Sequence, residues 1–184
     1  MQIASTYDLF IHELGEIYDA EHRFLEGQEV MAREATNGDL EGAIRQHIEQ
    51  TREHAFNIER VFNDLGQEPR REANEVARGL VNEAQEAITG AHTTDLRDCA
   101  IVSSVIKVEH FEMGSYRSLI TGAQLMGRRE AEQLLRNNMD QEEETARIAE
   151  SSSKEILRKA MEAEGQRPES EGLVERAKEK LSSQ

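Results

Sequence analysis

Residues 105–116 constrain the fold more than any other segment of the chain. In and around this segment, apolar residues recur at steps of three and four, which is the spacing of one face of an α-helix. Glu109 and Glu112 fall on the same face. Burying a carboxylate without a partner costs roughly several kcal/mol, so both side chains need a proton, a cationic partner or a metal ion. The segment therefore predicts a buried helix that carries a polar site.

The composition favours helices elsewhere as well. Hydrophobic residues make up 37% of the 184 residues and aromatic residues only 4%, with no Trp and two Pro. No stretch of useful length alternates apolar and polar residues with the period of two that a half-buried strand shows. We therefore predict an all-α protein.

The net charge of −15 excludes two classes of partner. Such a charge repels the phosphates of nucleic acids and anionic lipid surfaces, so we expect neither nucleic acid nor membrane as a partner. Cys99 is the one cysteine, which excludes an intramolecular disulfide. No segment is long and apolar enough to span a bilayer, and the N-terminus lacks a basic start followed by an apolar run. The expected location is the cytoplasm.

Helix-start and helix-stop signals divide the chain into two helical hairpins joined by a crossover. The crossover, residues 72–89, carries a shorter amphipathic pattern of its own. We expect one bundle domain over residues 1–168 and a polar C-terminal helix or tail over residues 169–184. The four long helices are expected over residues 6–35, 40–65, 94–126 and 128–163.

Glycines mark the predicted turns. We expect Asn37, Gly38 and Asp39 to supply a helix stop, a left-handed turn residue and a new cap in that order. Gly66 and Gly127 follow the second and third long helices and are expected to end them.

Four polar residues on the inner helix faces are predicted to lie at one level. In an antiparallel hairpin, residues equally far from the turn lie side by side, because each residue rises about 1.5 Å along either helix. The midpoint of Glu21 and His54 falls at the first turn, and that of Glu109 and Glu142 falls beside the second. Both pairs should therefore converge near the middle of the bundle.

Carboxylates and an imidazole inside a four-helix bundle match the ligand chemistry of a di-iron or di-manganese site. Buried ion pairs with Arg or Lys are the alternative for the glutamates, although their inner stripes offer almost no cation. His54 has the alternative of an ordinary core histidine, and Glu112 that of a base beside the metal ligands. The predicted metal ligands are Glu21, His54, Glu109, Glu112 and Glu142.

Three further polar residues are given lesser roles. Glu13 and His47 lie about two turns from the proposed level, so we interpret them as structural or proton-path residues. Tyr116 follows Glu109 by two turns on the same face and either bonds a ligand carboxylate or packs in the core.

Two runs, residues 9–21 and 108–116, resemble those of the YciE/YciF family of ferritin-like bacterial proteins. The second helix with His47, Thr51 and His54, and the fourth with Glu142 and Thr145, fit the same pattern over about residues 6–157. This resemblance implies a ferritin-like four-helix bundle that is usually dimeric. It also implies a dinuclear metal centre, as proposed for the family, and a link to bacterial stress responses.

The sequence departs from the family pattern at two positions and from the motif of ferritins and rubrerythrins at a third. Phe24 stands where the family more often has Gln, and Gln141 stands where an acidic residue is common before Glu142. Thr51, three residues before His54, replaces the Glu of the Glu-x-x-His motif that ferritins and rubrerythrins use. These departures also leave a weaker or mononuclear site open.

Two hypotheses for function follow. In the first, the protein is a homodimer that binds a pair of iron or manganese ions, with zinc as a substitute, and acts as a ferroxidase or a peroxide scavenger. Its small-molecule partners would then be metal ions with oxygen or peroxide. In the second, it is a non-enzymatic helical stress or interaction protein whose metal site is vestigial or empty.

Overall fold

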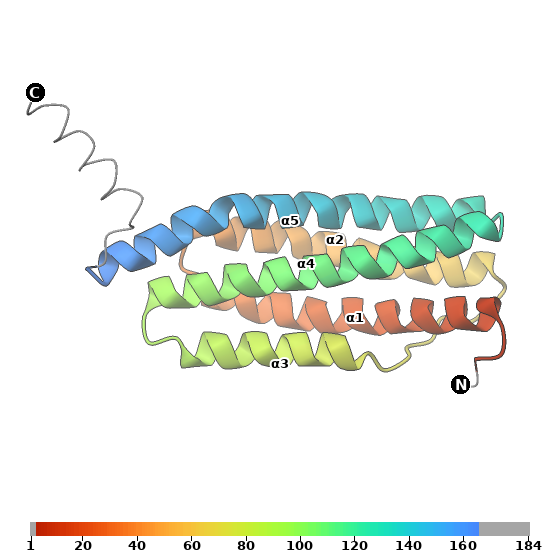
Figure 1. Ribbon diagram of the computed structural model, residues 1–184, viewed down its shortest axis with the longest axis horizontal. Coiled ribbons are helices and arrows are strands. Elements are labelled where there is room, and N and C mark those ends of the chain that lie inside the picture. The colour runs from red at the N-terminus through yellow and green to blue at the C-terminus, as the bar shows by residue number, and fades with distance from the viewer. Residues whose placement is uncertain (1–2, 166–184) are drawn as a thin grey trace, which may run out of the picture.

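The computed structural model describes residues 3–165, which contain five helices and no strand (Figure 1). The predicted all-α class is therefore confirmed. The predicted helix or tail over residues 169–184 lies outside the described residues. Among the helices described, none has the length and apolar character needed to cross a membrane. The helices are α1 (Thr6–Glu34), α2 (Gly38–Asp64), α3 (Glu75–Gly90), α4 (Thr94–Leu125) and α5 (Arg129–Ala163).

Four long helices, α1, α2, α4 and α5, form the bundle, and α3 is the crossover (Figure 1). Helix α3 packs against α1 and α4 and returns the chain along the bundle. Helix α4 consequently begins beside the end of α1, where Asp98 accepts hydrogen bonds from the backbone amide and hydroxyl of Thr36. Each long helix is thus antiparallel to both neighbours, which is the predicted ferritin-like arrangement.

Side-chain caps mark the starts of three of the long helices, α1, α2 and α4. Ser5 caps α1 and Thr93 caps α4, each with its hydroxyl oxygen accepting from a backbone amide in the first turn. Asn37 caps α2, so the prediction of Gly38 as a left-handed turn residue is wrong. Because α1 ends in an extended residue and Asn37 starts the next helix directly, the turn needs no left-handed residue.

Gly66 and Gly127 follow α2 and α4 with φ angles of 67° and 68°. Both therefore adopt the left-handed conformation that glycine takes without strain, as their predicted role as helix ends requires.

A polar layer separates two apolar clusters along the bundle. On α2, core residues 40–48 belong to one cluster and residues 58–65 to the other. On α5, residues 131–135 and 149–156 are divided in the same way. The buried polar side chains between them include Thr51, His54, Asn138 and Glu142. The long helices thus bring their buried polar groups to the middle of the bundle.

Two polar side chains lie at the border of the core. Asn57 of α2 is 5% exposed and donates a hydrogen bond of 2.9 Å to Asn138 Oδ1. Glu13 of α1, interpreted from the sequence as a structural or proton-path residue, is half-buried and accepts from the hydroxyl of Ser118 at the surface. Both residues lie near the border between the inner and outer faces of their helices, where a small rotation of the helix decides burial.

Candidate metal centre

Two groups of side chains inside the bundle could each hold a metal ion. Within each group the potential ligand atoms all lie within 4.8 Å of one another. Glu142 of α5 belongs to both groups, so the two form one continuous cluster. The first group contains His47, Glu109, Glu112 and Glu142, and the second contains Glu21, His54 and Glu142.

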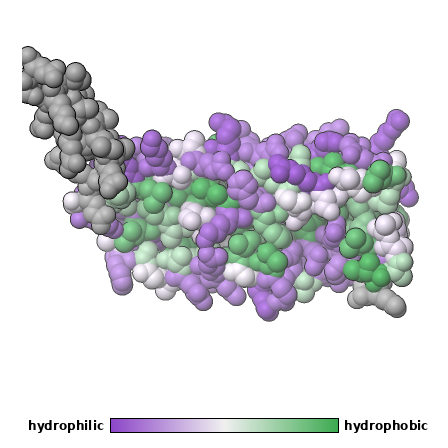
Figure 2. All heavy atoms as spheres, in the orientation of Figure 1, coloured by the Kyte–Doolittle hydropathy of each residue, from purple (hydrophilic) through white to green (hydrophobic). Residues whose placement is uncertain are grey.

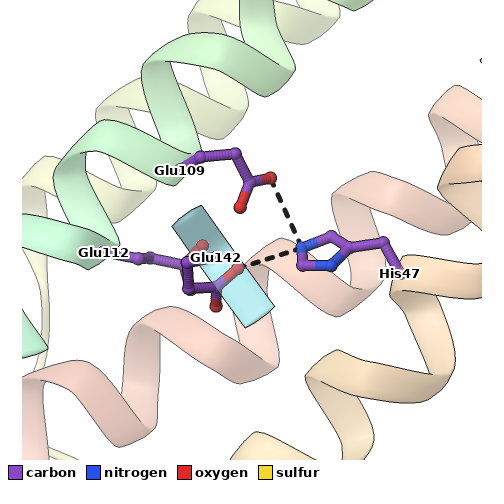
Figure 3. Close-up of side chains that lie close together, drawn as sticks. All are labelled: His47, Glu109, Glu112 and Glu142. Carbon is purple, nitrogen blue, oxygen red and sulfur yellow. Dashed lines mark ion pairs between the residues drawn. The ribbon is translucent and has the colours of Figure 1, made fainter. Parts of the chain in front are cut away.

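In the first group the imidazole of His47 faces carboxylates from two other helices (Figure 3). Its Nε2 atom lies 3.3 Å from Glu109 Oε1 and 3.4 Å from Glu142 Oε2. Glu112, one helical turn after Glu109 on α4, directs its carboxylate toward the same space (Figure 3). All four side chains are buried. The arrangement offers one nitrogen and several oxygen donors.

In the second group His54 lies between two carboxylates. Its Nδ1 atom is 2.9 Å from Glu142 Oε1 and 3.6 Å from Glu21 Oε2. Tyr116 donates a hydrogen bond to the other oxygen of Glu21 and accepts one of 3.0 Å from the side-chain amide of Asn138. Of the two roles considered for Tyr116, the structure therefore places its hydroxyl on a candidate ligand carboxylate.

Hydrogen bonds on the outer sides of both imidazoles fix their orientation. His54 Nε2 donates to Gln141 Oε1 at 3.0 Å, and His47 Nδ1 donates to Gln50 Oε1 at 3.2 Å. His47 Nδ1 also lies 3.1 Å from Thr145 Oγ1. In the neutral imidazoles that a metal binds, protons on these outer nitrogens would leave the lone pairs of His54 Nδ1 and His47 Nε2 facing the carboxylates, as ligand nitrogens require.

The carboxylates of the cluster differ from that of Asp19, which is also buried, in having no Arg or Lys partner among residues 3–165. Asp19 loses solvation on burial, but bonds from Arg23, the Asn74 amide and Arg71 outweigh that loss and lower its pKa. The ion-pair partners found for Glu21, Glu109 and Glu142 within residues 3–165 are His47 and His54. The cluster therefore lacks the cationic partners that stabilise Asp19.

Burial without cationic partners raises the pKa values of the four carboxylates. Burial, followed by repulsion from neighbouring carboxylates, raises the pKa of Glu142 to about 7 and that of Glu112 well above its ordinary value. Burial also raises the pKa of Glu109 to about 7 and that of Glu21 above its ordinary value. Burial opposes protonation of His54, but the carboxylates of Glu21 and Glu142 outweigh burial and raise its pKa. Without metal, the cluster is expected to hold protons near neutral pH.

The unpaired atoms of the cluster fit a pair of divalent cations. Four carboxylates and two neutral imidazoles carry a formal charge that two divalent cations balance. Oxygen and imidazole donors suit iron and manganese. Eight buried atoms of the cluster have no hydrogen-bond partner among residues 3–165: Glu21 Oε2, His47 Nε2, His54 Nδ1, Glu109 Oε2 and both carboxylate oxygens of Glu112 and Glu142.

The structure brings together all five residues predicted as metal ligands and adds His47, which the sequence analysis placed elsewhere. The rise along the helix alone places His47 two turns away from the cluster, but its side chain reaches along the axis. His47 and His54 are two turns apart on α2, yet their ring centroids lie 6.1 Å apart because the rings lean toward each other. The spacing of seven residues on one inner face was the signal available in the sequence.

The fold and the buried cluster define a ferritin-like helical bundle with a candidate metal centre. The chain belongs to the DUF892 family, a domain of unknown function whose family model matches residues 5–164. Protein YciF of Escherichia coli (strain K12) is 32% identical over 146 residues, which are 79% of this chain and 88% of that protein. The resemblance to the YciE/YciF family is thereby confirmed.

Solved structures match over most of their length. The crystal structure of the Escherichia coli stress protein YciF has a TM-score of 0.81 at 29% identity, covering 85% of this chain and 99% of that chain. YcfI of Rhodopseudomonas palustris, provisionally described as a structural protein, has a TM-score of 0.79 at 30% identity, covering 81% and 95%. A protein of Xanthomonas campestris, at 20% identity and a TM-score of 0.72, shows the fold alone.

We predict that the metal-free protein loses stability as the pH rises from about 5 to 8. Between the ordinary pKa of Glu109 and Glu142 and their folded pKa of about 7, the folded state binds more protons than the unfolded state. The stability from these protons is complete below about pH 4.5 and is lost as the pH rises through about 7. The raised pKa of His54 acts in the same direction.

Urea denaturation in the presence of a chelator measures this effect. The midpoint concentration is expected to fall from pH 5.5 to pH 7.5. A midpoint that rises over this interval would show that the carboxylates are not held in the protonated form that their burial requires.

Proposed function

We propose that the protein binds a pair of iron or manganese ions and uses the pair to oxidise Fe(II) with oxygen or peroxide. The observation that carries the proposal is the position of Glu142, which is common to both groups of potential ligands. Its two carboxylate oxygens lie 3.4 Å from His47 Nε2 and 2.9 Å from His54 Nδ1. A carboxylate between two sets of donors is the arrangement that a bridging ligand needs.

Each helix has a distinct part in the proposed centre. Glu142 of α5 would bridge the two ions. Glu21 of α1 and His54 of α2 would hold one ion, and Glu109 and Glu112 of α4 would hold the other with His47. Ligation rich in carboxylates favours the higher oxidation state, which is the chemistry that a bound pair would supply.

The surrounding residues orient and shield these ligands. Tyr116 and Asn138 hold Glu21 from one side through two successive hydrogen bonds. Gln141 and Gln50 hold the two imidazoles in the tautomers that can bind metal. The apolar clusters at both ends of the polar layer limit the access of bulk water along the bundle axis. Protons that leave the glutamates when metal binds would pass to solvent, so metal affinity should fall at low pH.

Anaerobic titration with Fe(II), followed by exposure to oxygen, tests the function. We expect near-ultraviolet absorbance from oxidised iron to appear faster than in buffer and in proportion to protein concentration. Glu143→Gln is the matched control, because Glu143 is exposed beside Glu142 and pairs with Arg117. Glu143→Gln should oxidise Fe(II) at the native rate, and Glu142→Gln should oxidise it no faster than buffer does. Oxidation no faster than in buffer, with either oxygen or peroxide, would contradict the proposal.

A second candidate function is that of a non-enzymatic helical protein that acts through its surface. The description of YcfI as a structural protein, although provisional, favours it. Large apolar side chains reach solvent, among them Phe56 at 59% and Leu125 at 85% exposure. Figure 2 shows apolar groups along the middle of one face, between hydrophilic margins. Surfaces of this kind are compatible with the homodimer that the family resemblance implies, which stays a prediction.

A further inference from the structure

A cavity of about 200 Å³ opens between α2 and α5 and reaches the metal centre. Its inner lining includes His47 and Glu109 of the first ligand group. Most of its lining surface is apolar, contributed by side chains of all five helices, including Phe24, Ile44, Val81, Val105 and Ala149. The cavity therefore joins an apolar space to the polar cluster.

Gln28 is a polar group of the cavity wall that is only partly satisfied. It is 5% exposed, and its Oε1 accepts a hydrogen bond of 3.0 Å from Thr51. Its Nε2 has no hydrogen-bond partner among residues 3–165. A buried amide donor without a partner costs about 1–3 kcal/mol, so this group favours a ligand that presents an oxygen acceptor.

The volume and the charges around the cavity restrict the ligand further. An apolar cavity of about 150 Å³ holds one benzene molecule, so this cavity has room for one aromatic ring with a small substituent. Exposed Glu144 and Glu155 line its outer part, and Glu109 lies at its inner end. The negative charges of Glu144 and Glu155 disfavour the entry of an anion, and the apolar walls disfavour its burial.

We propose that this cavity binds a small neutral molecule with an apolar body the size of one ring and an oxygen acceptor that receives a hydrogen bond from Gln28 Nε2. The bound molecule would lie beside His47 and Glu109. The proposal concerns binding alone and needs no metal, so it can be tested separately from the proposed oxidation of Fe(II).

Phenol is the probe, with toluene lacking the oxygen and benzoate adding a negative charge. We expect saturation-transfer NMR with the metal-free protein to give phenol a dissociation constant on the order of 1 mM, with weaker binding of both analogues. Gln28→Met should weaken the binding of phenol about fivefold, to the affinity of toluene, and should leave the affinity for toluene unchanged. Gln133→Met, an exposed change on α5, is the control and should change neither.

Filling the cavity provides a second variant. Ala149→Phe should abolish binding of phenol and toluene alike, and Ala43→Phe, at a half-buried position of the same wall, serves if the first variant does not fold. Phenol that binds no better than benzoate, or that binds equally to the native protein and to Gln28→Met, would overturn the proposal. Binding that persists in a folded cavity-filling variant would also overturn it.

Mn(II) then tests the position of the ligand relative to the candidate centre. If both proposals hold, Mn(II) should broaden the resonances of bound phenol. If the chain binds no Mn(II), phenol should still bind and depend on Gln28, which separates failure of the metal proposal from failure of this one. Metal binding without any effect on bound phenol would contradict the placement beside His47 and Glu109.

Discussion

Replacing Glu142 by glutamine is expected to weaken binding of both metal ions together. Glu142 contributes to both groups of potential ligands, whereas Glu21 and Glu109 each contribute to one. Loss of an outer partner of a metal ligand typically costs 10–100-fold in affinity, so loss of a bridging ligand should cost more than about 100-fold. Glu21→Gln should weaken mainly the ion held with His54. Isothermal titration calorimetry with Mn(II) measures the affinity of the native protein and of both variants.

The same substitution should have the opposite effect on the metal-free protein. At pH 8, ionised Glu142 is unfavourable in the folded state because its pKa is raised to about 7. Glutamine removes that charge but leaves a buried amide without a partner, so the net gain should be about 1 kcal/mol, or roughly 2–4 °C in melting temperature. Glu143→Gln should change neither the affinity for Mn(II) nor the melting temperature of the metal-free protein. A metal-free Glu142→Gln protein that melts well below the native protein would indicate a structural role instead.

Adding Mn(II) to the metal-free native protein is expected to raise its melting temperature by about 10 °C or more at pH 7.5. Each ion at about 1,000 times its dissociation constant stabilises the folded state by about 4 kcal/mol, and each kcal/mol corresponds to roughly 2–4 °C for a chain of this size. The ions also remove the repulsion among four buried carboxylates. Differential scanning calorimetry with and without chelator measures the shift.

The size of that shift should depend on pH. Protons and metal ions compete for the same carboxylates, so the shift should shrink between pH 7.5 and pH 5.5. A melting temperature that does not respond to Mn(II) or Fe(II) at either pH would favour the non-enzymatic candidate. Mg(II) is a useful comparison, because it prefers oxygen ligands with several waters and gains little from two imidazoles.

The sequence was sufficient to predict the bundle because its signals agree with one another. Apolar spacing, side-chain caps and glycines gave the helix ends, and the long crossover fixed the direction of α4 relative to α1. The convergence of Glu21, His54, Glu109 and Glu142 followed from their distances to the turns. These properties depend on the backbone repeat of the helix, which is nearly constant.

The remaining features of the site depend on side-chain direction, which spacing does not determine. His47 was placed outside the cluster by the rise along the helix alone, but its ring leans along the axis toward His54 and joins the cluster. Gln141 was noted only as a departure from the family pattern, yet its oxygen orients His54. Asn57 bonds Asn138 in the core, a contact that helical spacing did not indicate. The contacts of Gln141 and Asn57 join α2 to α5, two helices that are far apart in the sequence.

Equilibrium dialysis against Mn(II), followed by elemental analysis of the dialysed protein, tests the central claim most directly. The two groups of ligands that share Glu142 predict two ions bound per native chain. A native chain that binds no ion under conditions where it is folded would contradict the claim that these buried glutamates and histidines form a metal centre.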